Sequence, residues 1–138
     1  MISVLLISHG NMAEAMVDSA KMVMGKQPQL EGLALLPEDS AERFREKLKN
    51  KIEEIDTGDG LIILSDFPLG TPFNTAVQAQ AGYQHLTGMS MPMLLRILRD
   101  RSDPTVSAEV LCERALASAR QDGIFVNQFV KELRDRKQ

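Results

Sequence analysis

The sequence has few aromatic residues and little positive charge, and both shortages exclude a class of protein. It contains no tryptophan, one tyrosine and five phenylalanines. Surfaces that bind nucleic acids usually combine a basic stripe with interleaved aromatic side chains. Here 16 lysines and arginines are outnumbered by 19 aspartates and glutamates, giving a net charge of −3. We therefore expect no nucleic-acid partner.

Cysteine and histidine are also scarce. The single cysteine, Cys112, cannot form an internal disulfide, and it lies in an apolar stretch of helical periodicity. We interpret it as a small buried hydrophobic residue. The two histidines belong to no Cys/His cluster with metal-ligand spacing. We expect no metal and no other cofactor.

Long hydrophobic runs are missing as well. The longest apolar stretches are much too short to cross a bilayer. The apolar N-terminus has no basic segment before it and no small-residue cleavage site after it, so it is not typical of a signal peptide. A chain of 138 residues buries about two-thirds of its unfolded surface in one core. With no linker or repeat in the sequence, we expect one cytoplasmic domain over residues 1–138.

Short apolar runs alternate with amphipathic segments along the chain. Strands are predicted at residues 2–7, 32–37, 61–64 and 83–86, and helices at 11–24, 41–55, from 71 onward, 92–98 and 106–119. This alternation predicts an α/β fold, a doubly wound, mostly parallel sheet of four to five strands with helices on both faces. Residues 124–130 fit either an edge strand or a final helix.

Polar residues follow two of the predicted strands, where open α/β sheets bind ligands. His9 follows the first strand, and Asp66 follows the third. An imidazole is a nucleophile at neutral pH when one nitrogen keeps its lone pair and the other donates to an acceptor. Asp66 is the best acceptor available, so His9 and Asp66 are the candidate catalytic residues. Taken alone, a histidine in this position is more often structural.

Residues around this pair are suited to binding a phosphoryl group. The predicted helices beginning near Asn11 and Thr71 would present free N–H groups and a positive dipole end. Ser8 and Thr71 add hydroxyl groups, and the Thr71 hydroxyl is also expected to cap its helix. Gly10 and Gly70 let the backbone approach closely. The predicted phosphate-binding residues are therefore Ser8, Gly10, Gly70 and Thr71.

Three sequence blocks, in order, carry a resemblance to a known family. They are the strand that ends in Ser8-His9-Gly10, the segment DFPLGTPFN at residues 66–74, and the segment TGMSMPML at residues 87–94. In these blocks the chain resembles the enzyme IIA component of the mannose-type (mannose, fructose, sorbose) phosphotransferase system. Leu69 stands where that family usually has the first of two glycines, and Ser90 where it often has asparagine.

The resemblance implies a phosphoryl carrier. His9 would take a phosphoryl group from the carrier protein HPr and donate it to enzyme IIB. Enzyme IIB would in turn act with the membrane sugar permease components, which are indirect partners of this chain. It further implies that Asp66 pairs with His9, that the Thr71 hydroxyl helps to hold the phosphate, and that the fold is a parallel α/β sheet. The family also implies a homodimer. If residues 124–130 form an edge strand, that strand could pair with the sheet of a second copy.

Several residues near the motifs are ambiguous. His85 matches no motif and is expected to be a structural or surface residue. Phe67 and Pro68 are expected to stiffen and pack the loop, whereas Phe73 and Asn74 fit a structural role and a site role equally well.

Two rival functions also remain. One is a non-catalytic module that senses a phosphate-bearing ligand. The other is a histidine phosphatase, which would need converging arginines and a second histidine. In this chain, Ser8 replaces the arginine expected before His9.

Overall fold

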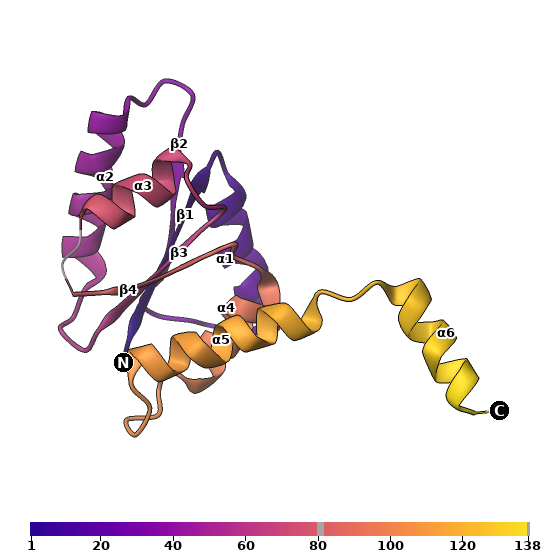
Figure 1. Ribbon diagram of the computed structural model, residues 1–138. Helices are drawn as coiled ribbons and strands as arrows, with labels where there is room; N and C mark the ends of the chain where they lie inside the picture. The colour runs from indigo at the N-terminus through magenta and orange to yellow at the C-terminus, as the bar shows by residue number, and fades with distance from the viewer. Residues whose placement is uncertain (80–81, 138) are drawn as a thin grey trace.

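A parallel four-stranded sheet forms the centre of the computed structural model, which describes residues 1–79 and 82–137 (Figure 1). The strands are β1 (Ser3–His9), β2 (Leu30–Leu35), β3 (Leu61–Ser65) and β4 (Gln84–Thr87). Their order in the sheet is β2-β1-β3-β4, and all three neighbouring pairs are parallel. The predicted parallel α/β sheet is confirmed, with four strands.

Helices cover both faces of this sheet. The helices of the described residues are α1 (Met12–Met24), α2 (Ala41–Ile55), α3 (Thr71–Gln78), α4 (Met91–Asp100), α5 (Ala108–Asp122) and α6 (Val126–Arg136), of which the first five cover the sheet. Helices α1, α4 and α5 pack on one face, and α2 and α3 pack on the other. Within the described residues, no helix is both long and apolar enough to span a bilayer.

The central strand β1 shows why the first apolar run is uninterrupted. Val4 and Leu6 point into the core beneath α1, α4 and α5, whereas Leu5 and Ile7 point into the core beneath α2 and α3. All four side chains are fully buried. A strand that is covered on both faces needs apolar residues at every position, because successive side chains alternate between the faces.

The starts of α2 and α3 differ in how they are capped. Ser40 caps α2, since its hydroxyl accepts the backbone N–H of Arg43 at 3.1 Å. Thr71 was expected to cap the next helix, but that prediction is wrong. Gly70 is the N-cap of α3, Thr71 is already its first residue, and no side chain caps this helix. The Thr71 hydroxyl is therefore free of the capping role.

The C-terminal segment is a helix, and the edge-strand alternative for residues 124–130 is wrong. Helix α6 extends away from the sheet and its covering helices, and it contains no buried residue (Figure 1). The apolar residues of this helix recur at helical spacing, as Val126, Phe129, Val130 and Leu133. A half-buried strand would instead alternate apolar and polar residues. This three-to-four-residue period explains why the helix forms.

Cys112 lies in the core, as the sequence predicts. It is a residue of α5, is 7 % exposed, and packs among the apolar residues of the core that α1 and α4 also cover. Burial raises the pKa of its thiol to about 11, and only the thiolate is strongly nucleophilic. We expect the native protein at pH 8 to resist a thiol-specific reagent, and the urea-unfolded protein to react stoichiometrically. Equally fast labelling of both forms would contradict this assignment.

Candidate functional site

The carboxyl ends of β1 and β3 bring His9 and Asp66 together. The two strands are neighbours, with Ile7 paired to Ser65, so the residues that follow leave the sheet at the same edge. The His9 ring nitrogen Nδ1 lies 2.7 Å from Asp66 Oδ2. The backbone N–H of His9 donates to the same oxygen at 2.9 Å. The structure thus brings together the two residues that the sequence predicts as catalytic.

Asp66 is held as a carboxylate. Its side chain is 6 % exposed, and it accepts hydrogen bonds from the His9 backbone, the His9 ring and the Phe67 backbone N–H, the last at 3.0 Å. Burial acts to raise the pKa of Asp66, but these three hydrogen bonds outweigh it and lower the pKa below its ordinary value.

The ionised carboxylate fixes the tautomer of His9. A carboxylate can only accept hydrogen bonds, so Nδ1 of His9 carries the proton and donates it to Asp66. The other ring nitrogen, Nε2, then keeps its lone pair. The His9 side chain is 44 % exposed. The arrangement therefore presents a nucleophilic nitrogen that a reactant from solution can reach.

The start of α3 lies against the His9 ring. A Cβ atom on Gly70 would come within 2.8 Å of the His9 ring carbon Cε1, so only glycine allows this approach. Cε1 lies between the two ring nitrogens, and the helix N-terminus is therefore close to Nε2. The first turn of a helix offers unpaired backbone N–H groups to an anion. Gly70 and Thr71, two predicted phosphate-binding residues, occupy this turn.

The other two predicted phosphate-binding residues, Ser8 and Gly10, form hydrogen bonds within the fold. The Ser8 hydroxyl is fully buried, donates to the Gly10 carbonyl at 3.1 Å and accepts the Ala13 backbone N–H at 2.8 Å. The Gly10 N–H donates to the Leu35 carbonyl at 2.8 Å. These bonds use the Ser8 hydroxyl proton and the Gly10 N–H within the fold. Gly10 is needed for a turn with φ of +59°, in the left-handed region that glycine tolerates.

The loop between Asp66 and α3 contains a strained residue. Leu69 has φ of +71°, in the left-handed region, which costs an L-residue about 1–2 kcal/mol. Its side chain is 79 % exposed, so little packing offsets the strain. The carbonyl of Leu69 accepts a hydrogen bond from the Asn74 side chain at 3.2 Å. This contact gives Asn74, whose role the sequence leaves open, a part in fixing the loop.

We expect Leu69→Gly to relieve this strain. The free energy of unfolding should rise by up to about 1 kcal/mol, because the extra backbone freedom of glycine in the unfolded chain offsets part of the gain. Urea denaturation measures the change. Leu69→Ala is the matched control, since it removes the exposed side chain but keeps the Cβ. A glycine variant less stable than the alanine variant would contradict the strain assignment.

Phe67 has a role at the site that the sequence analysis missed. Its ring stacks on the His9 imidazole, with centroids 4.9 Å apart and planes inclined by 11°. The sequence predicts only packing within the loop for Phe67. An aromatic residue directly after the candidate carboxylate is the available signal in the sequence, but the path of the loop decides which ring it covers.

His85 and Phe73 contact each other, and His85 also bonds to Ser65 at the end of β3, next to Asp66. The His85 ring nitrogen Nε2 lies 2.7 Å from the Ser65 hydroxyl, and burial lowers the pKa of His85. Phe73 packs against the His85 ring with centroids 5.2 Å apart. His85 is thus a structural residue of β4, as expected. It bonds to the end of β3 and provides no second histidine for a phosphatase-type site.

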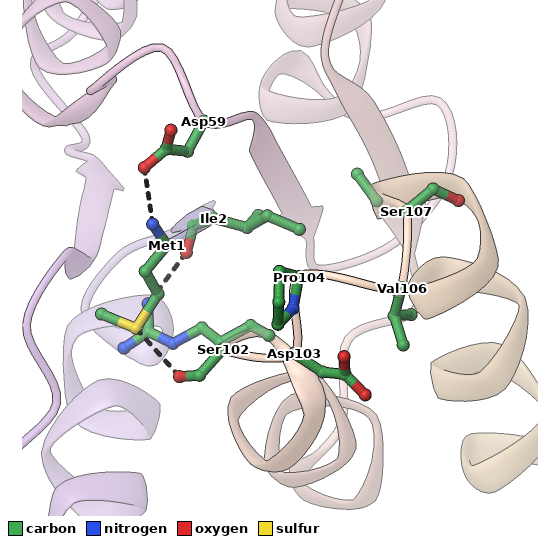
Figure 2. Close-up of a pocket in the computed structure, with 10 residues that line it drawn as sticks. Met1, Ile2, Asp59, Ser102, Asp103, Pro104, Val106 and Ser107 are labelled. Carbon is green, nitrogen blue, oxygen red and sulfur yellow. Dashed lines mark hydrogen bonds and ion pairs between the residues drawn. The ribbon is translucent and has the colours of Figure 1, made fainter.

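A pocket of about 310 Å³ lies at the opposite end of the sheet (Figure 2). The Met1 ammonium group forms an ion pair with Asp59 at 2.6 Å along its wall. The buried guanidinium of Arg101, at the same wall, donates to the backbone carbonyls of Ile2 and Gln29. The pocket is separated from His9 by the length of β1, roughly 20 Å at 3.3 Å per residue. It therefore takes no part in the candidate site.

Sequence comparisons identify relatives of this chain. Residues 3–112 match the family model described as PTS system fructose IIA component, where PTS is the phosphotransferase system. The chain is 31% identical over 105 residues to the PTS system mannose-specific EIIAB component of Escherichia coli (strain K12), covering 74% of this chain and 32% of that protein. It is 28% identical over 124 residues to the PTS system sorbose-specific EIIA component of Klebsiella pneumoniae, covering 88% and 89%.

These relatives differ in length. The chain spans about a third of the Escherichia coli protein and most of the Klebsiella pneumoniae protein.

Solved structures show the same fold. The phosphotransferase system component EIIA from Streptococcus agalactiae superposes with a TM-score of 0.82 at 20% identity, covering 93% of this chain and 99% of that one. The PTS IIA protein associated with the fucose utilization operon of Streptococcus pneumoniae gives 0.80 at 24% identity, covering 94% and 96%. At these identities, the likeness shows the fold alone.

Proposed function

Because this chain belongs to the PTS system fructose IIA component family, we propose that His9 is its phosphoryl carrier, taking the group from HPr and donating it to enzyme IIB. The observation that carries this proposal is the contact of 2.7 Å between His9 Nδ1 and Asp66. It leaves Nε2 as the free nucleophilic nitrogen. A non-catalytic module that only sensed a phosphate ligand would not need this pairing.

The transfer step follows from the state of the two residues. The lone pair of His9 Nε2 attacks the phosphorus of the phosphorylated donor, forming an N–P bond. The donor's N–P bond breaks, and the donor nitrogen leaves with that electron pair. The His9 ring gains positive character as it reacts, and the Asp66 carboxylate beside Nδ1 stabilises it. Transfer to enzyme IIB is the reverse sequence, with His9 Nε2 as the leaving group.

The start of α3 is proposed to hold the phosphoryl oxygens. Gly70 places the first turn of α3 against the His9 ring. Thr71, the first residue of α3, contributes a backbone N–H and a hydroxyl group to this turn. Pro72 has no N–H, so the backbone donors of this turn come from the residues on either side of it. The positive end of the helix dipole adds to the attraction for a dianionic group.

We propose that the protein acts in the cytoplasm together with its proposed partners. HPr would be the phosphoryl donor and enzyme IIB the acceptor, and enzyme IIB would supply the membrane sugar permease components. The names of the relatives specify mannose, sorbose and fructose, and the sequence and the site of this chain single out none of these sugars. We propose that residues 1–138 act as one phosphotransferase domain.

We also propose that the protein forms a homodimer. Helix α6 exposes Val126, Phe129 and Leu133 by 62%, 47% and 42%, and apolar surface of this kind is often covered by a second copy. We expect sedimentation at micromolar concentration to give twice the 15.3 kDa mass of one chain. Truncation before Ile124 should give a folded monomer, because no residue of α6 is buried. A mass near 15.3 kDa for the full chain would exclude the dimer.

Reconstitution tests the function directly. The protein is incubated with enzyme I, HPr and phosphoenolpyruvate, and its intact mass is measured with and without enzyme IIB. We expect the gain of one phosphoryl group, which is lost when enzyme IIB is added. A chain that stays unmodified under conditions that phosphorylate HPr would refute the proposal. Release as inorganic phosphate at the same rate without an acceptor would indicate a phosphatase.

A further inference from the structure

The ring of Phe67 makes a second contact with His9, independent of Asp66. Asp66 bonds to one edge of the imidazole, at Nδ1. Phe67 instead lies on a face of the ring, with the two planes inclined by only 11° and the centroids 4.9 Å apart. A hydrogen bond at one edge leaves the ring free to tilt about that bond. The stacked Phe67 ring prevents the imidazole from tilting toward the face that Phe67 covers.

The loop is built to bring Phe67 over the imidazole. A Cβ on Gly70 would lie 2.8 Å from His9 Cε1 and 3.2 Å from Cζ of Phe67, so the missing side chain makes room for both rings. Leu69 has the left-handed conformation that turns the chain toward α3. The Asn74 side chain donates a hydrogen bond to the Leu69 carbonyl. The backbone of Phe67 also donates to Asp66. One short loop therefore sets both the carboxylate and the stacked ring.

The orientation of the ring plane matters for phosphoryl transfer. The reactive lone pair of Nε2 lies in the plane of the imidazole, and the attacking and leaving atoms must be roughly in line through phosphorus. A tilt of the ring would turn the lone pair away from that line. Small misplacements of a reacting atom cost rate steeply, and an error of 1 Å can cost about 100-fold.

We propose that Phe67 is a positioning residue that fixes the plane of the His9 imidazole, and so aims the Nε2 lone pair at the incoming phosphorus. This inference rests on the proposed phosphoryl transfer to His9. It assigns Phe67 no contact with the phosphoryl group itself. Phe67 is 50% exposed, so contact with the donor protein is the competing explanation, and the experiment must separate the two.

The test compares Phe67→Leu with the wild type in rapid single-turnover transfer from phosphorylated HPr. Leucine keeps an apolar side chain but loses the flat ring. We expect the maximal transfer rate to fall about tenfold, with the half-saturating HPr concentration unchanged. Leu69→Ala removes an exposed apolar side chain from the same loop without touching the stack, and it should leave the maximal rate unchanged.

A spectroscopic signature accompanies the kinetic one. In the wild type, the carbon-bound ring protons of His9 should show upfield ring-current shifts from Phe67. These shifts should disappear in Phe67→Leu, while the methyl resonances of the core stay in place. Loss of the core resonances would indicate general unfolding, and Phe67→Met, which also fills space without a flat ring, then provides the same kinetic comparison.

Three results would overturn the inference. One is an unchanged maximal rate in Phe67→Leu. Another is a raised half-saturating concentration with the maximal rate intact, which would make Phe67 a docking residue. The third is the absence of ring-current shifts on His9 in the wild type. If wild-type protein gains no phosphoryl group at all, the proposed function itself fails, and that outcome is distinct from these three.

Discussion

We expect His9→Ala to abolish acceptance of a phosphoryl group from phosphorylated HPr and to remain folded. The nucleophilic Nε2 is removed, and the chain has only one other histidine, His85. That ring is bonded to Ser65 and packed against Phe73. Intact-mass measurement after reconstitution should therefore show no added phosphoryl group.

We expect the His9→Ala variant to stay folded because the backbone hydrogen bonds to Asp66 are retained. Asp66 still accepts the backbone N–H groups of residues 9 and 67, so the buried carboxylate keeps two of its three hydrogen bonds. Loss of the stacked pair with Phe67 should lower the free energy of unfolding by about 1 kcal/mol. His85→Gln is the matched control, since glutamine can also bond to Ser65, and it should still accept phosphate. Phosphorylation of His9→Ala would refute the assignment.

Asp66→Asn should slow phosphoryl transfer in both directions by about 100-fold or more. The carboxylate accepts three N–H groups, two at Oδ2 and one at Oδ1. An asparagine amide has one oxygen and one N–H₂ group, so in either orientation a donor faces a donor. If the amide nitrogen faces His9, it also favours the wrong tautomer, with the proton on Nε2. Transfer rates equal to those of the wild type would remove Asp66 from the mechanism.

The same substitution should change the dependence of stability on pH. The pKa of Asp66 in the folded protein lies below its ordinary value of 3.8. Its ionised form therefore stabilises the fold fully above about pH 4. This contribution is lost as the pH falls through the lower pKa of the folded state. We expect the free energy of unfolding of Asp66→Asn to fall less steeply in acid than that of the wild type. Parallel curves would contradict the shifted pKa.

The sequence was sufficient to predict that His9 and Asp66 lie at the same edge of the sheet. Strands buried on both faces are recognisable as continuous apolar runs, and polar residues at their carboxyl ends mark the edge where sites form. This reasoning placed His9 and Asp66 at one edge. Their direct contact depends on β1 lying beside β3, a strand order that the periodicity of the sequence does not contain.

The sequence does not show the direction in which single groups point. Ser8 was a candidate phosphate ligand because a hydroxyl precedes His9, but strand alternation turns Ser8 into the core, where it bonds to the start of α1. The Thr71 cap failed by one residue, since α3 begins at Thr71 itself. The packing of Phe67 on His9 depends on the left-handed turn at Leu69, where the sequence offers no glycine to signal it.

The most direct test of the account is to identify the phosphorylated atom. Protein labelled with ¹⁵N is phosphorylated through enzyme I and HPr, and the phosphorus–nitrogen couplings of the modified ring are measured by NMR. We predict a single phosphohistidine at His9, with phosphorus bonded to Nε2 and the proton on Nδ1 facing Asp66. Phosphorus on Nδ1 of His9, on His85, or on no histidine would contradict it.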